Sequence, residues 1–224
     1  MNKHYYCTLD TETSKSGKAA DIGIVVSDKN GNIIEKHGIL LIDIFNKEDL
    51  FYDNRSDTWT LDNARARKLK YQEMLNNGLR VFGSVAYVNN TLRDIVTRFN
   101  PCLTAYNIGF DYSACLATGI DLLQFNRRFD LMNCARDNIC STDTYKVWAY
   151  ENNYLTSGGN PSYTVDAVAH YIDSSLPPEP HTALEDAMLY ESTILAYMIA
   201  LPRTRAQILA AGASKTGKAK WCAQ

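Results

Sequence analysis

The N-terminal stretch constrains the fold most, because it has the pattern of three β-strands joined by short connections. Residues 5–10, 22–27 and 33–44 are rich in residues that favour strands. Asn30-Gly31 lies between the second and third of these segments, and Asn-Gly is the preferred dipeptide of a tight hairpin because both residues accept a positive φ. The sequence therefore predicts an α/β domain that opens with three antiparallel strands.

Helical and short strand patterns follow in the rest of the chain. Apolar residues recur at helical spacing over 84–99, and Asn100-Pro101 ends that helix. Residues 103–106 are expected to form a short apolar strand, followed by a turn and a helix. In such an α/β unit the functional groups commonly lie at the turn after the strand. Residues 129–132 fit either a strand or the start of the helix that carries 134–139. The other expected helices are 61–77, 110–119, one capped by Ser162, and about 182–200.

Length and composition exclude several classes of protein. The 224 residues fit either one generous domain or a domain with an extension, and the formal net charge of −2 does not by itself indicate a nucleic-acid-binding protein. No apolar run is long enough to cross a bilayer, and residues 1–4 lead into a strand rather than a signal peptide. We therefore expect a cytoplasmic protein that has no membrane partner.

The six cysteines are scattered without a CxxC pair. An even count is compatible with disulfides, but without a secretory signal the thiols are expected to be free and packed in the core. We predict no zinc site. The cysteines are Cys7, Cys102, Cys115, Cys134, Cys140 and Cys222.

Positive charge is concentrated in two stretches. Residues 203–224 contain five basic residues and no acidic one, and a second basic stretch surrounds residues 65–70 and Arg80. Such stretches occur on faces exposed to solvent and also on surfaces that bind a polyanion, and the sequence does not decide between these two explanations. The basic residues are Arg203, Arg205, Lys215, Lys218 and Lys220 in the tail, and Arg65, Arg67, Lys68 and Lys70 in the other stretch.

Four acidic residues lie at the ends of apolar segments rather than on solvated faces: Asp10, Glu12, Asp111 and Asp186. Asp10 and Glu12 alternate along the first strand, so both carboxylates point to one face. An unpaired buried carboxylate costs several kcal/mol, and four that meet would repel one another. Two Mg²⁺ or Mn²⁺ ions would remove the repulsion, activate a water and stabilise the leaving oxygen of a displacement at phosphorus.

His181 stands just before the last predicted helix. The prolines of 177–180 suit the entry to a helix, which places His181 at the junction and Asp186 in the second turn. A histidine with its ordinary pKa of about 6.5 is suited to take a proton from water. Each residue alone fits a structural role, such as a strand acid, a helix-start carboxylate or a loop histidine. Their order and their elements together indicate a hydrolytic metal site.

Three segments resemble the exonuclease motifs of the DnaQ-like 3′-to-5′ exonucleases of the DEDDh subgroup. They are Leu9-Asp10-Thr11-Glu12-Thr13, Tyr106-Asn107-Ile108-Gly109-Phe110-Asp111 and His181-Thr182-Ala183-Leu184-Glu185-Asp186-Ala187. Their order and spacing agree with that family, and the resemblance covers about residues 4–200. It implies a ribonuclease H-like fold, in which a central mixed β-sheet is flanked by α-helices.

The resemblance also implies an activity and roles for individual residues. Such an enzyme hydrolyses the terminal phosphodiester at the 3′ end of single-stranded DNA or RNA and releases nucleoside 5′-monophosphates. Asp10, Glu12 and Asp186 would hold one divalent cation, Asp10 and Asp111 would serve the second, and His181 would be the general base. Contacts with the terminal nucleotide are expected from Thr11, Thr13, Asn107 and Phe110.

Two features depart from the family pattern. Relatives commonly have Thr-Gly soon after the first motif, where this chain has residues 14–18, Ser-Lys-Ser-Gly-Lys, and residues 45–83 look like an insertion into a domain of residues 1–201. Residues 202–224 would be a basic, flexible tail. A nuclease-derived binding module and a polymerase accessory protein are the alternative functions. DNA is slightly favoured over RNA, and a homodimer is left open.

Overall fold

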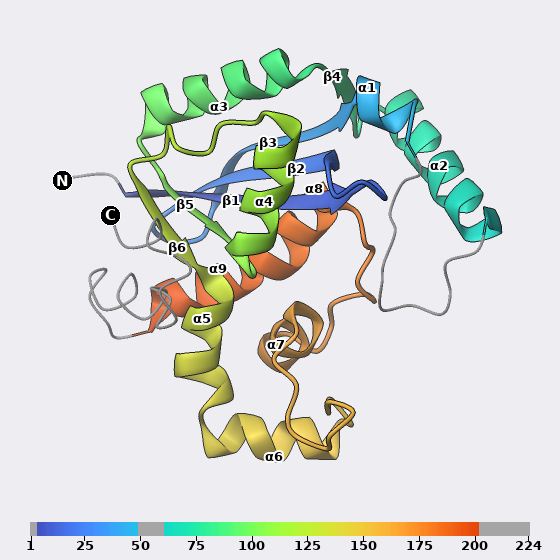
Figure 1. Cartoon of the computed structure of the whole chain (residues 1–224). Helices are drawn as coiled ribbons and strands as arrows, with labels where there is room; N and C mark the ends of the chain where they lie inside the picture. Colours follow the sequence, from blue (N-terminus) through green and yellow to red (C-terminus); the bar gives the residue numbers. More distant parts are fainter. Residues whose placement is uncertain (1–3, 49–60, 202–224) are drawn as a thin grey trace.

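The computed structural model describes residues 4–48 and 61–201, which form a six-stranded mixed sheet flanked by helices (Figure 1). The strand order is β4-β3-β2-β1-β5-β6. The first three strands are antiparallel, as the sequence predicts, whereas β5 runs parallel to β1, β6 to β5 and β4 to β3. The strands are β1 (Tyr5–Thr13), β2 (Ala19–Asp28), β3 (Ile33–Leu41), β4 (Val81–Gly83), β5 (Cys102–Ala105) and β6 (Arg127–Asp130).

Two details of this opening meander differ from the prediction. The third strand ends at Leu41 instead of Ile44, because helix α1 (Ile42–Phe45) begins directly after it. In the β2–β3 turn only Gly31 of the Asn-Gly pair takes a positive φ, of 83°. The Asp28 carboxylate accepts hydrogen bonds from the Asn30 and Asn32 N–H groups at 2.7 and 3.0 Å. An Asx-type turn therefore replaces a turn built on two left-handed residues.

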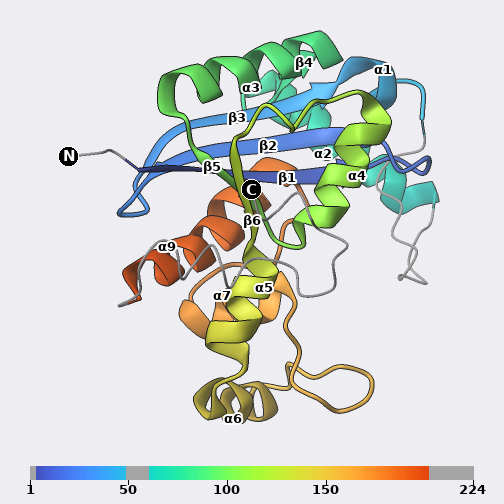
Figure 2. The ribbon, with the colours of Figure 1, turned by 60° about the vertical axis from the view of Figure 1, so that its left-hand side comes forward.

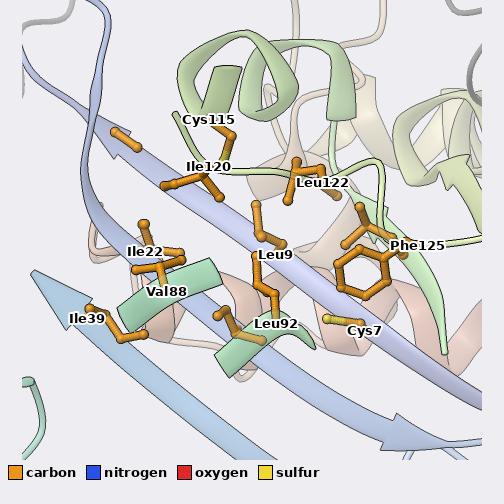
Figure 3. Close-up of a cluster of buried hydrophobic side chains, with 14 of the residues drawn as sticks. Cys7, Leu9, Ile22, Ile39, Val88, Leu92, Cys115, Ile120, Leu122 and Phe125 are labelled. Atoms are coloured by element: carbon orange, nitrogen blue, oxygen red, sulfur yellow. The ribbon is translucent and has the colours of Figure 1, made fainter. Parts of the chain in front are cut away.

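One face of the sheet is covered by α3 (Val85–Phe99) and α4 (Ile108–Thr118). Alternate residues of β1, such as Cys7 and Leu9, point to this face and pack with Leu92 of α3 and Cys115 of α4 (Figure 3). The Ser84 hydroxyl caps α3 by accepting a hydrogen bond from the Tyr87 N–H. Both helices end at a left-handed residue, at Asn100 and Gly119, close to the predicted ends.

The other face is covered by helices from the second half of the chain (Figure 2). The last of them runs without a break from Ala183 to Ala200, which confirms the predicted extent, but its middle is π-helical. Tyr6 of β1 and Phe129 of β6 pack into this second layer. Its elements are α5 (Leu131–Ala135), η1 (Arg136–Cys140), α6 (Asp143–Glu151), α7 (Val165–Ile172), α8 (Ala183–Glu185), η2 (Asp186–Glu191) and α9 (Ser192–Ala200).

Three local predictions in this layer need correction or completion. Both alternatives for 129–132 hold in part, because β6 ends at Asp130 and α5 begins at Leu131. The cap of α7 is Thr164, whose hydroxyl accepts from the Ala167 N–H, and not Ser162. The Ser162 hydroxyl instead accepts a hydrogen bond from the Thr164 N–H, and it therefore stabilises the turn that precedes the helix cap. Helix α6 was not predicted, although Thr142 caps it in the ordinary way.

The predicted insertion contributes α2 (Leu61–Asn76) and β4, close to the expected helix of 61–77. Tyr71 and Met74 of α2 are buried against Leu40 and Phe45. The helix therefore covers one end of the sheet rather than standing away from it. The side chains of Arg65 and Arg67 and the whole 203–224 tail lie outside what the structure describes.

The described cysteines are free thiols, as predicted. Four of them are buried, and burial raises the pKa of Cys7 and Cys115 well above the ordinary thiol range. Cys222 lies outside the described residues. Over residues 4–48 and 61–201, no helix combines the length and the apolar character that a membrane span requires.

Candidate active site

The site lies where the carboxyl ends of parallel strands meet. Thr8 of β1 is level with Thr104 of β5, and Ala105 of β5 is level with Asp130 of β6. Asp10 therefore lies two residues beyond the part of β1 that pairs with β5, next to the turn that leaves β5. This edge of a parallel arrangement is where α/β proteins commonly place functional groups.

The third motif reaches Asp10 because β2 has a glycine at the crossing point. Gly23 pairs with Asp10 in the sheet, and a Cβ atom on Gly23 would lie only 2.2 Å from the Ala183 carbonyl oxygen. No larger residue leaves room for α8 to lie this close to the strand. The glycine therefore brings Asp186, which follows α8, close to the acids of β1.

Glu12, His181 and Asp186 converge: each offers a ligand atom, and the three atoms lie within 4.8 Å of one another. Asp186 is 5% exposed; its Oδ2 accepts from the Thr182 N–H at 2.7 Å, but its Oδ1 has no hydrogen-bond partner in the structure. A buried carboxylate oxygen without a donor fits a cation ligand. The donor set of oxygens and one imidazole suits a divalent ion such as Mg²⁺ or Mn²⁺.

His181 occupies an exposed loop position and has a left-handed backbone, with a φ of 52°. Its side chain is 57% exposed, and its Nδ1 lies 3.8 Å from the Glu179 carboxylate. Thr182 is the N-cap of α8, so the imidazole stands just outside the helix, as the sequence predicts. The ring combines access to solvent with proximity to the acids.

Asp111 opens α4 and is 1% exposed. Burial raises the pKa of this carboxyl to about 7, although the Thr11 hydroxyl donates to its Oδ1 at 2.9 Å and opposes the shift. The turn before α4 is held by Asp130, whose carboxylate accepts from the Asn107 N–H and caps α5 through the Asn133 N–H. Asp130 thus positions the turn that precedes Asp111. Its place at the end of an apolar strand was a sequence signal of such a role.

A fifth acid, Glu191, faces the same cluster and was missed. Its Oε1 accepts from the Tyr106 N–H at 2.7 Å, whereas its buried Oε2 has no hydrogen-bond partner among the described residues. In an α-helix, residues five apart point roughly 140° away from each other, but a π-helix has more residues per turn and i→i+5 hydrogen bonds, which brings such residues closer to one side. The π-helical segment η2 therefore turns Asp186 and Glu191 to the same side. The sequence contained one signal of this role, because Glu191 is an acid that lies between Ala187 and Ile194, two residues on the buried side of the helix.

The cluster is electrostatically unbalanced. Burial raises the pKa of Asp10 well above its usual range, and the charges of Glu191, Asp111, Glu12 and Asp186 raise it further. Burial, followed by the Glu179 charge, raises the pKa of Asp186 to about 7. Like charges that destabilise one another in a buried site are the expected counterpart of bound cations.

The predicted substrate contacts surround this cluster but differ in accessibility. Thr11 is 4% exposed and its hydroxyl is directed to Asp111, so its side chain supports the acid. Thr13 is half-buried at the end of β1. Asn107 is exposed with a left-handed φ of 63°, and the Phe110 ring is 52% exposed beside Asp111. The nucleotide-binding roles of all four stay predictions.

Comparison with solved structures identifies the architecture. Exonuclease I without ligand matches 92% of this chain and 43% of its own, with a TM-score of 0.51 and 13% sequence identity. The fold resembles that of exonuclease I. The E. coli exonuclease I structure with a 5cy-dT13 oligonucleotide matches 92% of this chain and 42% of its own, with a TM-score of 0.51 and 14% identity.

The extent of these matches limits what they show. This chain spans about two-fifths of the exonuclease I chain, and at this identity the likeness concerns the fold alone. Exonuclease X in complex with 5′ overhanging duplex DNA matches 93% of this chain and 99% of its own, with a TM-score of 0.46 and 15% identity. No family model matches the chain, and no curated protein sequence does. The α/β fold with its mixed sheet and three leading antiparallel strands is similar to that of exonuclease I.

Proposed function

We propose that the protein is a metal-dependent 3′-to-5′ exonuclease of the DEDDh type, which removes nucleoside 5′-monophosphates from single-stranded ends. The observation that carries the proposal is the convergence of Glu12, His181 and Asp186 within 4.8 Å, at the strand edge that also holds Asp10 and Asp111. The exonuclease I-like fold supports it. A binding module derived from a nuclease is less well supported, because every acid and the histidine are retained.

The residues fit two divalent cations. Asp10, Glu12 and Asp186 would hold one, and Asp10 with Asp111 would serve the other. When bound, such cations lower the pKa of a water molecule and offset negative charge on the leaving oxygen. Thr11 keeps Asp111 oriented through the hydroxyl hydrogen bond of 2.9 Å, and the backbone N–H of Thr182 does the same for Asp186 at 2.7 Å.

His181 would act as the general base. Its exposed ring lies within reach of the site, while the fixed start of α8 limits its position. As the water oxygen attacks the terminal phosphorus, the imidazole takes the proton, the bond from phosphorus to the 3′ oxygen breaks, and the nucleoside 5′-monophosphate leaves. The departing 3′ oxygen takes a proton from solvent water and becomes the free 3′ hydroxyl at the end of the shortened strand.

A single strand is the proposed substrate. Phe110, which is 52% exposed next to Asp111, offers a ring on which a terminal base can stack. Exonuclease I has been solved with a bound dT13 oligonucleotide, so single-stranded DNA is the first substrate to test and RNA of the same sequence the second.

The test measures nucleotide release from matched 5′-labelled DNA and RNA 20-mers, with Mn²⁺, Mg²⁺ or EDTA. Stepwise shortening from the 3′ end, with release of 5′-monophosphates only when the metal is present, is the expected result. A 3′-phosphorylated strand should resist digestion, because the terminal group no longer fits. Absence of monophosphate release from every single-stranded substrate with either metal would sink the proposal.

The role of His181 is tested separately with His181→Ala. Removal of a general base typically costs about 10²- to 10⁴-fold in turnover. We expect a loss within that range, an unchanged melting temperature, and Mn²⁺ affinity within a few-fold of the wild type. If the main effect were a large loss of Mn²⁺ affinity, His181 would be a metal ligand instead of the base.

A further inference from the structure

Arg80 is a buried arginine at the end of the predicted insertion, between α2 and β4. Its side chain is 0% exposed, and its guanidinium lies between two carboxylates. Nε and Nη2 donate to the two oxygens of Asp21 at 2.9 and 3.1 Å. Nη1 and Nη2 donate to the two oxygens of Glu185 at 3.1 and 2.5 Å. Arg80 therefore joins β2 to the helix of the third motif with two bidentate pairs.

Asp21 connects the same group to the backbone of α8. Its Oδ2 also accepts from the Ala183 N–H at 3.0 Å and from the Tyr71 hydroxyl at 2.9 Å. The Ala183 N–H is one of the free donors at the start of a helix, so Asp21 caps α8 from a neighbouring strand. The insertion contributes Tyr71 and Arg80, and both of them fix the orientation of this carboxylate.

Glu185 and Thr182 carry the connection into the proposed active site. The Thr182 hydroxyl donates to Glu185 Oε2 at 2.7 Å, and the Thr182 N–H donates to Asp186 Oδ2 at 2.7 Å. Asp186 is the next residue after Glu185 in the helix. A displacement of the Glu185 carboxylate would therefore move both the residue that follows it and the amide that orients Asp186.

The sheet makes room for this arrangement. A Cβ atom on Gly38 of β3 would lie 2.8 Å from the Arg80 Cδ and Nη1 atoms. A second link from the insertion reaches the loop before the helix, because Lys70 Nζ donates to the Pro180 carbonyl at 3.1 Å, one residue before His181. Two cationic side chains of the insertion thus contact the third motif on either side of His181-Thr182.

We propose that Arg80 is a positioning residue, through which the insertion holds the third motif so that Asp186 and His181 face the acids of β1. This inference rests on the proposed function for its meaning in catalysis. The planar guanidinium can bind two carboxylates in bidentate fashion, which the ammonium of lysine cannot do. Arginine is therefore required at this position for its geometry as well as for its charge.

The experiment compares Arg80→Lys with Arg98→Lys. Arg98 also contacts two acids, with Nη2 2.7 Å from Glu35 and Nε 2.8 Å from Asp94, but it is 42% exposed and joins α3 to β3 away from the site. Three quantities are measured in the full chain: Mn²⁺ affinity by calorimetry, kcat and KM on single-stranded DNA, and hydrogen exchange of the Thr182 and Ala183 amides.

We expect Arg80→Lys to weaken Mn²⁺ binding and to lower kcat by about tenfold each, with KM within twofold of the wild type. Exchange of the Thr182 and Ala183 amides should accelerate at least tenfold, while the amides of β1 change little. Arg98→Lys should leave all these quantities within twofold. If Arg80→Lys does not fold, Glu185→Gln serves instead, because its amide keeps one acceptor for Arg80 and the same direction of change is expected.

The outcomes separate the two proposals. An inactive wild type that binds Mn²⁺ would refute the exonuclease proposal, whereas Mn²⁺ affinity and amide exchange would still decide the role of Arg80. A folded Arg80→Lys or Glu185→Gln protein with wild-type Mn²⁺ affinity and amide exchange would overturn the positioning role. A wild type that binds no Mn²⁺ would overturn both.

Discussion

Two buried acidic groups lie side by side in this protein, and only the first shares a buried basic side chain of the described residues. In the first, Asp21 and Glu185 share the guanidinium of Arg80 and accept further hydrogen bonds. In the second, Asp10 and Asp186 lie among other acids, and Asp186 Oδ1 has no donor. Glu185 and Asp186 are consecutive residues, yet they belong to different groups.

The difference shows in the pKa values and indicates what each group is for. Burial raises the pKa of Glu185, but hydrogen bonds from Arg80 and Thr182 bring it below its usual range. Burial, followed by the Glu179 charge, raises the pKa of Asp186 to about 7, and the one hydrogen bond from the Thr182 N–H opposes this shift only in part. The first group is completed by the chain itself, whereas the second would be completed by the cations of the proposed metal site.

The largest effect is expected from Asp186→Asn. Losing one charged ligand of the proposed metal site should reduce turnover by about 10³- to 10⁴-fold, or roughly 4–5 kcal/mol. The same change removes an unpaired buried charge, so the metal-free protein should melt at the same temperature or higher at pH 8. Nuclease assays and melting curves in EDTA measure the two effects. A variant that is both inactive and much less stable would show that Asp186 serves the fold.

Asp21→Asn should show the opposite pattern. The amide keeps the shape of the side chain but leaves Arg80 and its hydrogen-bond partners without full compensation, which typically costs about 4 kcal/mol for a buried pair. We expect this loss in urea unfolding monitored by circular dichroism. The substitution matches Asp186→Asn in size and burial. If the two variants lost equal stability, the distinction between the two acidic groups would be wrong.

Metal-free stability should depend on pH through the second group. The pKa values of Asp111 and Asp186 are raised to about 7 in the fold from an ordinary value of 3.8. The folded state therefore binds more protons than the unfolded state between these values. The stabilisation is fully present below about pH 4 and is lost as the pH rises through 7. Between pH 5 and 8 we expect the unfolding free energy in EDTA to fall by about 5 kcal/mol, roughly half of it from each of the two groups.

Added Mn²⁺ provides the control for this pH dependence. Protons and cations compete for the same oxygens, so the stabilisation by Mn²⁺ should grow with pH and reduce or reverse the slope. Asp186→Asn should flatten the slope in EDTA by removing one of the titrating groups. An unchanged slope in that variant would assign the pH dependence to other residues.

Much of the fold was predictable because local signals and the packed structure agree. The apolar runs of the first three strands, the Ser84 cap and the Asn100-Pro101 stop lie where the structure places their elements. The predictions of local structure failed where a contact with another part of the chain determines the element or its cap. Ser162 has the chemistry of a cap, but Thr164 is the residue whose hydroxyl reaches the helix N–H. Strand β4 has only three residues, and its pairing with β3 is not visible in its own sequence.

The candidate site was predictable in its motifs and not in its supporting residues. An acid or a histidine stands out in these motifs because its neighbours in the sequence are mostly apolar; the residues are Asp10, Glu12, Asp111, His181 and Asp186. Glu191 reaches the cluster only because of the π-helical turn, which a helical periodicity of 3.6 residues does not anticipate. Asp21 lies within an apolar strand, which was a signal, but its partner Arg80 comes from 59 residues further along the chain.

The smallest effect is expected from substituting a threonine of β1, and two threonines of that strand provide the comparison. Thr11→Val removes the hydroxyl that donates to Asp111 at 2.9 Å, whereas the Thr8 hydroxyl, on a side chain that is 0% exposed, has no hydrogen-bond partner in the structure. A lost hydrogen bond to a buried carboxylate costs about 1 kcal/mol at pH 8, while Thr8→Val should be neutral or slightly stabilising because it replaces an unpaired hydroxyl by a methyl group. Loss of the donor should also raise the pKa of Asp111, so half-maximal Mn²⁺ binding by Thr11→Val should shift to higher pH. Equal behaviour of the two variants in urea unfolding and in the pH dependence of Mn²⁺ binding would show that Thr11 does not support the acid.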